Sequence, residues 1–345
     1  PIHGTGLKLI PRSLANYGFT NIIGVPEQEV LSGDFPTVAS PNPEEPSAMA
    51  MAIEKAKETG AEVVMASDPD ADRIGLVIRD NNGEYVLING NQIVMIFLNY
   101  LMTRNTELGT LTGNEYIVKT IVTTETIRTI AEAQHIKMYD CFTGFKWIAN
   151  VMRENEGKAR YLGGGEESYG FLAEDFVRDK DSVSAISLMA EIAAWAKDKG
   201  LNMTDMLIDI YMKYGFSREK GISLVRKGKS GAEEIIALMK QFRENPPKEI
   251  AGSPVVTVKD FQSLVETNVA TGETKKLDMP ATSNVLQYYT ADRTKVSVRP
   301  SGTEPKIKFY IEVHDTLASA DEYKATEARA DEKINRIAKE FGITK

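Results

Sequence analysis

The stretch AEVVMASDPDADRIGLVI, residues 61–78, joins two apolar runs through a short acidic loop. The runs AEVVMA and IGLVI are continuously apolar rather than alternating, which is typical of strands in a sheet covered on both faces. The preceding PSAMAMAIEKAKETG predicts a helix that ends at Gly60. Together these patterns predict an α/β unit with the acidic loop at the carboxyl end of a buried strand, where α/β sheets bind ligands.

The acidic loop places Asp68, Asp70 and Asp72 at alternate positions. Carboxylates this close repel one another unless a cation lies between them, and oxygen ligands suit hard divalent ions. A calcium-binding EF-hand is excluded because Arg73 and Arg79 stand where it needs glycine and glutamate. Three carboxylates leave coordination positions for water or a phosphate oxygen, as Mg²⁺ prefers. The loop therefore favours Mg²⁺, and a solvated acidic turn is the alternative.

Strand and helix patterns divide the 345-residue chain into three segments, 1–88, 89–212 and 213–345. The first also contains TNIIGV at 20–25, an apolar run that predicts a short strand. In the second segment we expect helices over 91–102, 124–134, 145–155 and 181–200, and strands over 115–122, 136–140 and 159–164.

The third segment is predicted to be a separate α+β module. It follows a junction at 211–221 and has a helix over 231–244, a Pro/Gly-rich loop over 244–254 and a final helix over 317–341. Its clearest strand is KIKFYIEV, 306–313, in which apolar and polar residues alternate, so that one face is expected to be buried.

Composition narrows the class of protein. A net charge of −8 argues against nucleic acid or an acidic membrane surface as the main partner. The longest apolar run, 93–102, is too short to cross a bilayer, and no signal peptide is evident. A single cysteine, Cys141, fits a reducing compartment and hence the cytoplasm. Three scattered histidines argue against a histidine triad or zinc site.

Two further loops carry polar groups suited to a phosphosugar. YLGGGEESYG, 161–170, combines glycines that permit close backbone approach with Glu166, Glu167 and Ser168, which can bind vicinal hydroxyls. VRPSGTEPK, 298–306, offers groups that match a phosphate dianion, namely Arg299, Ser301, Gly302 and Thr303. A flexible turn with solvated glutamates and a plain hairpin turn are the respective alternatives.

Two more motifs are candidates for the same site. In FVRDKDS, 176–182, Lys180 lies between two aspartates that would keep it charged, or the run is a surface set of ion pairs. FTGFKWI, 142–148, contributes Thr143, Gly144 and Lys146, or marks only the start of a helix.

In this order, SDPDADR, GGGEESYG and RPSGTEPK resemble the motifs of the α-D-phosphohexomutases, the phosphoglucomutase/phosphomannomutase family. The resemblance runs from PIHGTG to the last helix, and SPNPEEP, TGFKWIA and VRDKDSVSA are most similar to its long-form, phosphopentomutase-like branch. It implies two related three-layer α/β domains with mixed sheets, 1–88 and 89–212. It also implies a C-terminal α+β domain of TATA-box-binding-protein-like fold, 213–345.

The family's first domain carries a phosphoserine in a Thr-x-Ser-His-Asn-Pro loop, a motif that this sequence does not contain. TVASPNP lacks the histidine and matches a second-domain segment, so Ser40 is not assigned as the nucleophile. With the start at Pro1, this predicts that the chain comprises domains two to four and is inactive alone in the mutase cycle.

The resemblance also implies roles for the candidate residues. Asp68, Asp70 and Asp72 would hold Mg²⁺ together with a phosphoserine oxygen. Arg73 would lie beside the moving phosphoryl group or the sugar, and Lys180 would transfer a proton. Sugar binding is implied for Glu166 and Ser168 and for the adjoining loop of Thr143, Gly144 and Lys146. Binding of the phosphate that is not transferred is implied for Arg299, Ser301, Gly302 and Thr303.

The implied reaction moves a phosphoryl group between positions 1 and 6 of hexose phosphates through a hexose 1,6-bisphosphate, with Mg²⁺ neutralising the charge that develops. Two other functions stay open: a metal-dependent sugar phosphatase with Asp68 as nucleophile, and a non-catalytic sugar-phosphate-binding module. The sequence does not distinguish glucose, mannose and pentose preference, and it does not indicate the oligomeric state.

Overall fold

The computed structural model describes residues 1–226, 228–302 and 304–343. The chain forms two compact units, Pro1–Ile210 (unit 1) and Tyr211–Lys345 (unit 2), each with a mixed α/β fold as predicted. The further division of unit 1 near residue 88 stays a prediction. Among the described residues, no helix has the length and apolar character that a membrane span requires.

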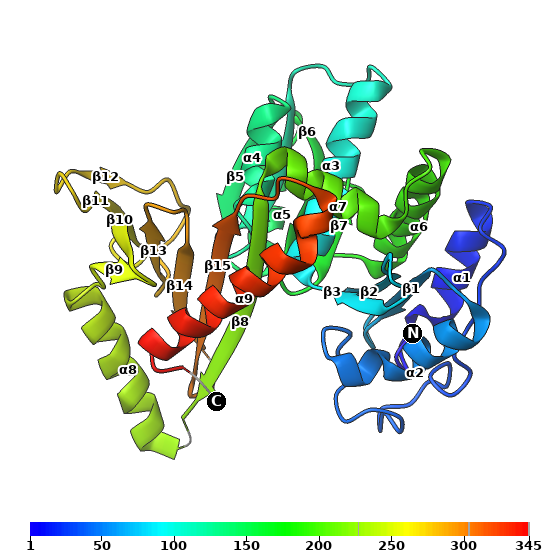
Figure 1. The fold of residues 1–345 in the computed structure, drawn as a ribbon, viewed down its shortest axis with the longest axis horizontal. Coiled ribbons are helices and arrows are strands. Elements are labelled where there is room, and N and C mark those ends of the chain that lie inside the picture. The colour runs from blue at the N-terminus through cyan, green and yellow to red at the C-terminus, as the bar shows by residue number, and fades with distance from the viewer. Residues whose placement is uncertain (227, 303, 344–345) are drawn as a thin grey trace. The chain divides into compact units, whose positions relative to one another are not determined.

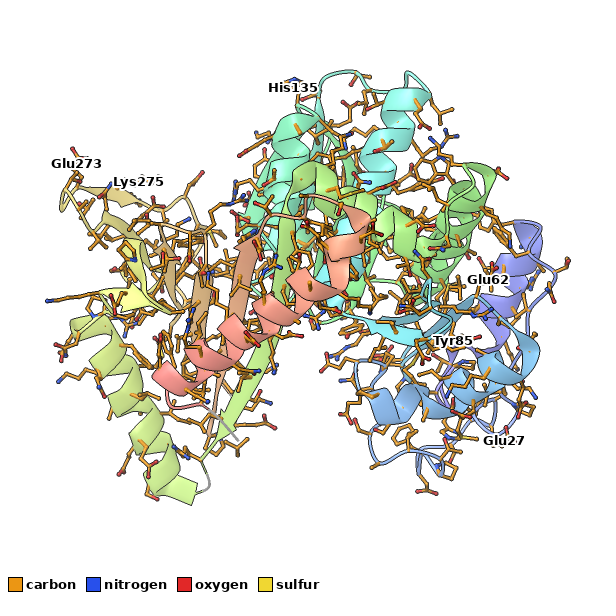
Figure 2. All side chains as sticks on the ribbon, viewed as in Figure 1. Glu27, Glu62, Tyr85, His135, Glu273 and Lys275 are labelled. Atoms are coloured by element: carbon orange, nitrogen blue, oxygen red, sulfur yellow. The ribbon has the colours of Figure 1, made fainter. Side chains whose placement is uncertain are left out.

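The first part of unit 1 contains helices α1 (Gly6–Asn16) and α2 (Pro46–Thr59) and a small sheet (Figure 1). The sheet has the order β1 (Val63–Ser67), β2 (Ile74–Arg79), β3 (Tyr85–Ile88), with both pairs antiparallel. Tyr85 anchors β3 because its hydroxyl lies within hydrogen-bonding distance of the Ala56 and Ala61 carbonyls around the end of α2 (Figure 2). The predicted strand–acidic loop–strand arrangement is thus a β hairpin.

The predicted strand at 20–25 is wrong, and helix α1 was not foreseen. Residues 20–25 form no strand, and Ile22 and Ile23 are 42% and 47% exposed. The segment lines a cavity of about 690 Å³ together with residues of β1. A strand needs a hydrogen-bonding partner, and local apolar character does not supply one.

The second part of unit 1 surrounds a four-stranded mixed sheet. Its strands are β4 (Glu115–Thr120), β5 (Lys137–Cys141), β6 (Arg160–Glu166) and β7 (Gly170–Ala173). Its helices are α3 (Gly90–Glu107), α4 (Thr126–Ala133), α5 (Phe145–Asn155) and α6 (Ser182–Asp198). The sheet order is β5-β4-β6-β7, with β4 parallel to β5 and β6, and β7 antiparallel to β6.

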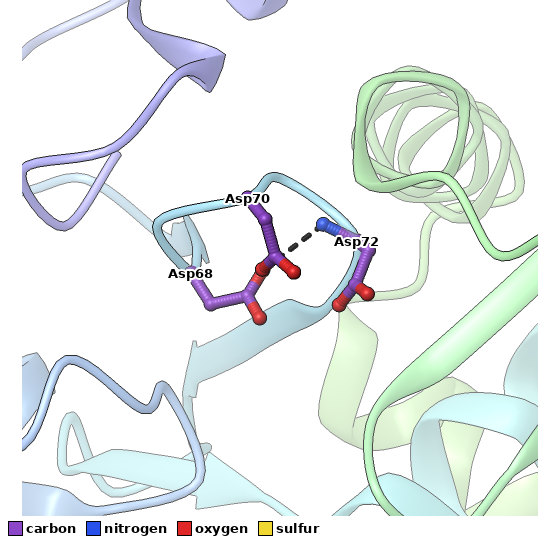
Figure 3. Close-up of side chains that lie close together, drawn as sticks. All are labelled: Asp68, Asp70 and Asp72. Carbon is purple, nitrogen blue, oxygen red and sulfur yellow. Dashed lines mark hydrogen bonds between the residues drawn. The ribbon is translucent and has the colours of Figure 1, made fainter. Parts of the chain in front are cut away.

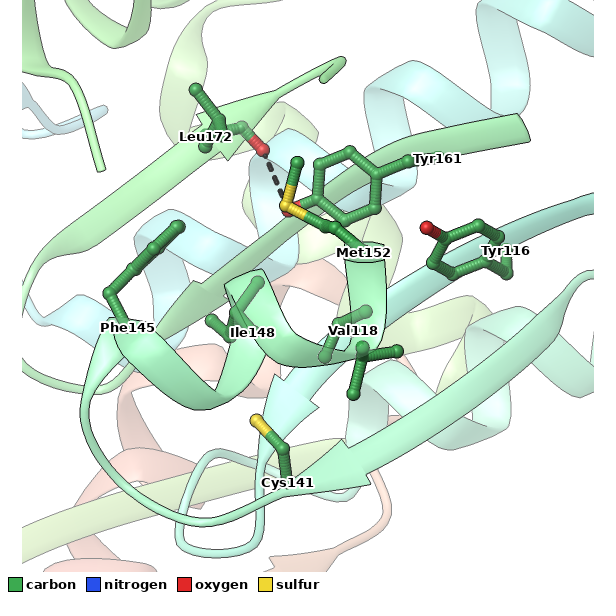
Figure 4. Packing of buried hydrophobic residues seen from close by; sticks show 9 residues of the cluster. Tyr116, Val118, Cys141, Phe145, Ile148, Met152, Tyr161 and Leu172 are labelled. Atoms are coloured by element: carbon green, nitrogen blue, oxygen red, sulfur yellow. Dashed lines mark hydrogen bonds between the residues drawn. The ribbon is translucent and has the colours of Figure 1, made fainter. Parts of the chain in front are cut away.

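One hydrophobic core joins this sheet to α5 (Figure 4). Cys141 is buried in it beside Val118 and Ile148, so this thiol is a packed core group. The connections from β4 to β5 and from β5 to β6 place the later strands on opposite sides of β4. Such a switch in strand order opens a crevice at the carboxyl ends of the strands, which is where α/β sheets bind ligands.

Unit 2 is built on an antiparallel sheet of order β12-β11-β10-β13-β14-β15-β8, with β9 paired to β10. Its strands are β8 (Phe216–Val225), β9 (Glu249–Ile250), β10 (Ser253–Asp260), β11 (Val265–Asn268), β12 (Thr274–Lys276), β13 (Leu286–Thr290), β14 (Lys295–Pro300) and β15 (Lys306–Asp315). Its helices are α8 (Gly228–Glu244), η1 (Ala320–Glu322) and α9 (Tyr323–Glu340). Glu273 and Lys275 mark the exposed β11–β12 hairpin in Figure 2.

Three expectations for this region are corrected. The predicted junction at 211–221 is the end of helix α7 (Met203–Tyr214) followed by strand β8, and the last α-helix begins at Tyr323 rather than 317. In β15 the apolar face is buried as predicted, but Glu312 on the other face is also buried. Its carboxylate lies 2.8 Å from the Lys295 ammonium, and this ion pair offsets the cost of burying either charge.

Candidate active site

The acidic loop of the β1–β2 hairpin brings the three predicted metal ligands together. One carboxylate oxygen from each of Asp68, Asp70 and Asp72 lies within 4.8 Å of the others (Figure 3). The loop holds this shape partly through Asp68, whose Oδ1 accepts hydrogen bonds from the backbone N–H groups of Asp72 (3.0 Å) and Arg73 (2.9 Å). The sequence pattern therefore correctly predicted a convergent carboxylate cluster.

The electrostatics of the cluster fit a cation. Burial raises the pKa of Asp68 to about 7, two backbone hydrogen bonds oppose this effect, and repulsion from Asp72 and Asp70 adds to it. Asp72 Oδ1 is buried and accepts no hydrogen bond from any residue that the structure describes. The Arg73 Nε lies 3.7 Å from Asp68 and 3.9 Å from Asp72, which neutralises the three carboxylates only in part. Hard oxygen donors with an unsatisfied negative charge are the donor set that Mg²⁺ binds.

Backbone contacts join the aspartate loop, residues 68–72, to two other predicted loops. The N–H of Ile74 donates to the Tyr169 carbonyl (3.0 Å), and Arg73 forms a β-bridge with Gly170. The N–H of Ser182 donates to the Ala71 carbonyl (3.1 Å). The aspartate loop, GGGEESYG and VRDKDS thus meet within unit 1, although the aspartate loop is about a hundred residues from the other two in sequence.

Two residues at this junction have left-handed backbones. Ala71 has φ 59° and Tyr169 has φ 71°, a region that costs energy for residues with a Cβ. Both carry carbonyls that accept the interloop hydrogen bonds described above. Strained backbone held by surrounding contacts is common at functional sites.

Lys180 lies inside this junction. Its ammonium is 2.8 Å from Asp72 Oδ2 and 3.6 Å from Asp179. Burial alone would lower the pKa of Lys180, but Asp72, Asp179 and Glu166 raise it overall, so the side chain is a stable cation. The sequence predicted that both flanking aspartates, Asp179 and Asp181, keep Lys180 charged. Asp181 instead caps α6 by accepting hydrogen bonds from the N–H groups of Val183 and Ser184.

Glu166 ends β6 and is 6% exposed. Burial raises the pKa of its carboxyl, and the Lys180 charge offsets this only in part, as do hydrogen bonds with Ser168 and the Gly144 N–H. Arg73 contributes a weaker favourable charge. The predicted sugar residues Glu166, Ser168 and Gly144 therefore lie together, and the cations Lys180 and Arg73 link them to the aspartate loop.

The rest of FTGFKWI is less closely joined to this group. Gly144 has φ 101° and precedes α5, and Thr143 is half-buried beside it. Lys146 is exposed, and its ammonium lies 5.4 Å from the centre of the Trp147 ring. The structure therefore places Thr143 and Lys146 next to the site and gives neither a contact with the carboxylates among the described residues.

The glycines of GGGEESYG differ from expectation. Gly163, Gly164 and Gly165 lie in buried strand β6 rather than in a loop open to ligand. A Cβ at Gly165 would come within 2.6 Å of Val94 on α3, and one at Gly163 within 3.0 Å of Leu101. Gly163 and Gly165 thus allow α3 to pack directly on the strand.

The sequence grouped Glu167 with Glu166 and Ser168 as a side chain that could bind sugar hydroxyls, but the Glu167 carboxylate is bonded within the protein. Its carboxylate accepts hydrogen bonds from the Thr120 (3.0 Å) and Thr123 (3.5 Å) hydroxyls at the end of β4. A Cβ at Gly90 would come within 2.0 Å of the Glu167 carbonyl. Glu167 thus fixes the position of the loop next to Glu166. The signal in the sequence was the pair Thr120 and Thr123 at the end of an apolar strand, because their hydroxyls need an acceptor.

Unit 2 carries the predicted phosphate loop between β14 and β15. Arg299 and Ser301 are half-buried and Gly302 is exposed, whereas Thr303 lies outside the described residues. The Ser301 N–H donates to the Lys306 carbonyl (2.7 Å). Arg299 stands directly opposite Lys308 on the neighbouring strand. Like charges at such positions repel, so this pair favours an anion, and sequence reasoning had not linked Lys308 to the loop.

Comparison with protein families gives three matches along the chain. Residues 1–83 match phosphoglucomutase/phosphomannomutase α/β/α domain II, residues 89–214 match domain III, and residues 259–330 match the C-terminal domain. The phosphoglucomutases of Staphylococcus haemolyticus and Staphylococcus epidermidis are 34% and 36% identical over 91% and 90% of this chain. The chain spans about half the length of these relatives, 56% in each case.

Solved structures show the same fold. A phosphoglucomutase/phosphomannomutase family protein of Burkholderia thailandensis aligns over 99% of this chain and 59% of its own, with a TM-score of 0.62 and 18% identity. Parafusin, a phosphoglucomutase of Paramecium, aligns over 90% of this chain and 52% of its own, with a TM-score of 0.57 and 18% identity. The multi-domain α/β fold inferred from sequence is thereby confirmed.

Proposed function

Because the chain belongs to the phosphoglucomutase/phosphomannomutase family, we propose that it supplies the metal, sugar and phosphate loops of a phosphohexomutase. The enzyme would interconvert hexose 1- and 6-phosphates through a hexose 1,6-bisphosphate. The observation that carries the proposal is the backbone junction in unit 1 that joins Asp68, Asp70 and Asp72 to Glu166 and Lys180. The reactive serine belongs to a Thr-x-Ser-His-Asn-Pro loop, a motif that the 345 residues do not contain.

Asp68, Asp70 and Asp72 would hold Mg²⁺, because their convergent oxygens and partly uncompensated charge suit a hard divalent ion. The bound ion would supply charge neutralisation for a phosphoryl group in transfer. Arg73 lies beside two of these carboxylates and is a second cation for that group. The backbone bonds to Asp68 hold the loop in shape before a ligand arrives, which limits the reorganisation needed on binding.

Glu166 and Ser168 would orient the sugar by accepting hydrogen bonds from its hydroxyls. The burial of Glu166 strengthens such bonds, because few water molecules compete for its oxygens. The sugar must bind in two orientations, so that either its 1- or its 6-phosphate lies at the reactive serine. A carboxylate that accepts from two neighbouring hydroxyls can serve both orientations.

Lys180 would hold and transfer the proton of the hydroxyl that gains or loses a phosphoryl group. Its ammonium sits between Asp72 and the sugar-binding Glu166, so it lies where the metal and sugar loops meet. Arg299, Ser301 and Gly302 of unit 2, with Thr303, would bind the phosphate that is not transferred. The facing cations Arg299 and Lys308 support this assignment.

The test measures binding and turnover separately. Calorimetry should show Mg²⁺-dependent binding of glucose 1-phosphate to the chain, weakened about tenfold or more by Glu166→Ala because a charged hydrogen-bond acceptor is lost. Glu58→Ala, an exposed position on α2, is the matched control and should bind normally. The chain joined to a family domain with the Thr-x-Ser-His-Asn-Pro loop should convert glucose 1-phosphate to glucose 6-phosphate. ³¹P NMR measures this conversion.

The other outcomes separate the alternatives. Conversion by the chain alone, in the presence of glucose 1,6-bisphosphate, would contradict the need for an external serine. Release of inorganic phosphate that Asp68→Asn stops would favour a phosphatase. Binding without turnover even in the joined protein would favour a non-catalytic module. Rates of the joined protein on glucose, mannose and ribose phosphates would define its preferred sugar.

A further inference from the structure

We infer that the N-terminal HGTG segment, His3–Gly6, is a brace that positions the metal loop, an inference that rests on the proposed metal site at Asp68, Asp70 and Asp72. The segment is far from the aspartates in sequence and contributes no carboxylate. It is nevertheless packed directly against the backbone of Asp68 and Pro69.

Gly4 makes the closest contact. A Cβ at this position would lie 2.4 Å from the Cα of Pro69 and 2.7 Å from the carbonyl oxygens of Asp68 and Pro69. These are backbone atoms, which cannot turn aside as a flexible side chain can. Any larger residue at position 4 must therefore displace the peptide that joins the first aspartate to the rest of the loop.

Hydrogen bonds on both sides of Gly4 fix this contact. The Ile2 N–H donates to the Ser67 carbonyl (3.0 Å), just before the first aspartate. The Thr5 N–H (2.8 Å) and the Thr5 hydroxyl (3.1 Å) both donate to the Pro69 carbonyl. Thr5 of the segment and the adjoining Ile2 thus hold the backbone on both sides of Asp68.

His3 anchors the brace to the rest of unit 1. Its ring is buried, with Nδ1 2.9 Å from the Val30 carbonyl and Nε2 2.8 Å from the Thr37 hydroxyl. Its backbone N–H donates to the Gln28 carbonyl (3.0 Å), and its φ of 55° is unusual for a residue with a Cβ. A strained backbone persists only where several contacts hold it, and here they turn Gly4 toward the metal loop.

The consequence is a loop whose ligands are oriented from outside the ligand set. Asp70 is exposed and follows directly after Pro69, so its position depends on where that residue is held. Residues that orient metal ligands typically change metal affinity about 10–100-fold when they are altered. HGTG residues are therefore proposed as positioning residues, because they contact the backbone of the loop and add no carboxylate to the cluster.

The test is Mn²⁺ affinity of the whole chain, measured by electron paramagnetic resonance, since Mn²⁺ prefers the same oxygen ligands as Mg²⁺. Gly4→Ala should weaken binding about tenfold or more. Gly33→Ala is the matched control, because a Cβ there meets nothing within 4 Å, and its affinity should equal wild type. Thr5→Val should weaken binding about fivefold through loss of one hydrogen bond, and Thr5→Ser should restore it.

Circular dichroism and thermal unfolding without metal establish that each variant is folded. If Gly4→Ala is folded and has wild-type Mn²⁺ affinity, the positioning role of the HGTG segment is refuted, whereas the metal site is not. A wild-type chain that binds no Mn²⁺ would overturn the metal site and the inference with it. Should Gly4→Ala not fold, the Thr5 pair decides: equal affinity of Thr5→Val and Thr5→Ser would refute the brace.

Discussion

Asp70 is the most exposed of the three clustered aspartates, and its carboxylate makes no hydrogen bond that the loop needs for its shape among the described residues. Asp68, in contrast, is buried and accepts two backbone hydrogen bonds. At the scale of single residues, one aspartate therefore shapes the loop while another is available to a cation. This division gives a substitution that tests metal binding with little effect on folding.

Asp70→Asn should reduce Mn²⁺ affinity about tenfold or more, because one anionic oxygen is replaced by a neutral amide. The unfolding midpoint without metal should stay near that of wild type, since exposed substitutions usually change stability by at most about 0.5 kcal/mol. Calorimetric titration measures the affinity, and Asp34→Asn at another exposed position is the control. Unchanged affinity in Asp70→Asn would contradict a metal site at this loop.

A second residue-scale prediction concerns Glu115, whose carboxylate caps the turn before β4. It accepts from the N–H and hydroxyl of Thr112, both at 2.8 Å, and from the N–H groups of Gly113 (3.0 Å) and Asn114 (3.1 Å). Burial by itself would raise the pKa of Glu115, but these hydrogen bonds lower it overall, below its ordinary value of 4.5. The ionised form is thus favoured by folding.

Glu115→Gln should cost about 2 kcal/mol of unfolding free energy at pH 7, because an amide N–H₂ would face backbone N–H donors. A lowered folded-state pKa gives stability that is present above the ordinary pKa and lost as pH falls through the folded-state value. The difference in unfolding free energy between wild type and Glu115→Gln should therefore decrease below pH 4.5. Urea unfolding across pH measures it, with exposed Glu58→Gln as control; a constant difference at every pH would refute the charge-based cap.

At the scale of elements, the glycines of β6 show how packing and function share one stretch of sequence. The strand ends in Glu166, which we propose binds the sugar, and Gly165 just before it accommodates Val94 of α3. The position of Glu166 is therefore set by how closely α3 approaches β6. Glu167 adds a second restraint through the threonines at the end of β4.

Gly165→Ala should lower the unfolding free energy by about 1–3 kcal/mol, because the added methyl group overpacks the contact with α3. Its Cβ would lie 2.6 Å from Val94 and 2.9 Å from the Gly170 carbonyl. Gly221→Ala in strand β8 is the matched control, since its Cβ would meet nothing within 4 Å. Urea unfolding compares the two, and equal effects would show that α3 does not pack on β6 as described.

At the scale of the whole molecule, the chain has two compact units, and the aspartate loop belongs entirely to unit 1. A ligand that binds only the folded form stabilises it by about 2.7 kcal/mol at a hundredfold excess over its dissociation constant. Metal should therefore slow amide exchange in unit 1 and leave unit 2 unaffected.

Hydrogen exchange with and without Mg²⁺ should show protection of peptides covering residues 61–78 and 1–6. Exchange in β13, β14 and β15 should stay unchanged, because these strands belong to unit 2. Asp70→Asn should abolish the protection at equal Mg²⁺ concentration. Protection that spreads equally over both units would indicate that they unfold as one body.

Much of the fold was predictable because it depends on local pattern. The predicted helices 145–155 and 181–200 agree closely with α5 and α6, and the continuous apolar runs on either side of the aspartate loop form strands β1 and β2. Residues 20–25 failed as a strand because pairing depends on a distant partner. The predicted junction at 211–221 was wrong because this stretch contains the end of helix α7 and the first part of strand β8. Only Gly215, with φ 96°, separates the two elements.

The sequence by itself determined the residue types and the proximity of Asp68, Asp70 and Asp72, since alternate positions in one tight turn lie close to one another. Only the tertiary structure decided that Lys180 pairs with Asp72, that Glu166 lies at Gly144, and that Gly4 packs on Pro69. These contacts join residues many positions apart. They arise from the way that helices and strands pack, and a local sequence pattern does not show which distant residues this packing brings together.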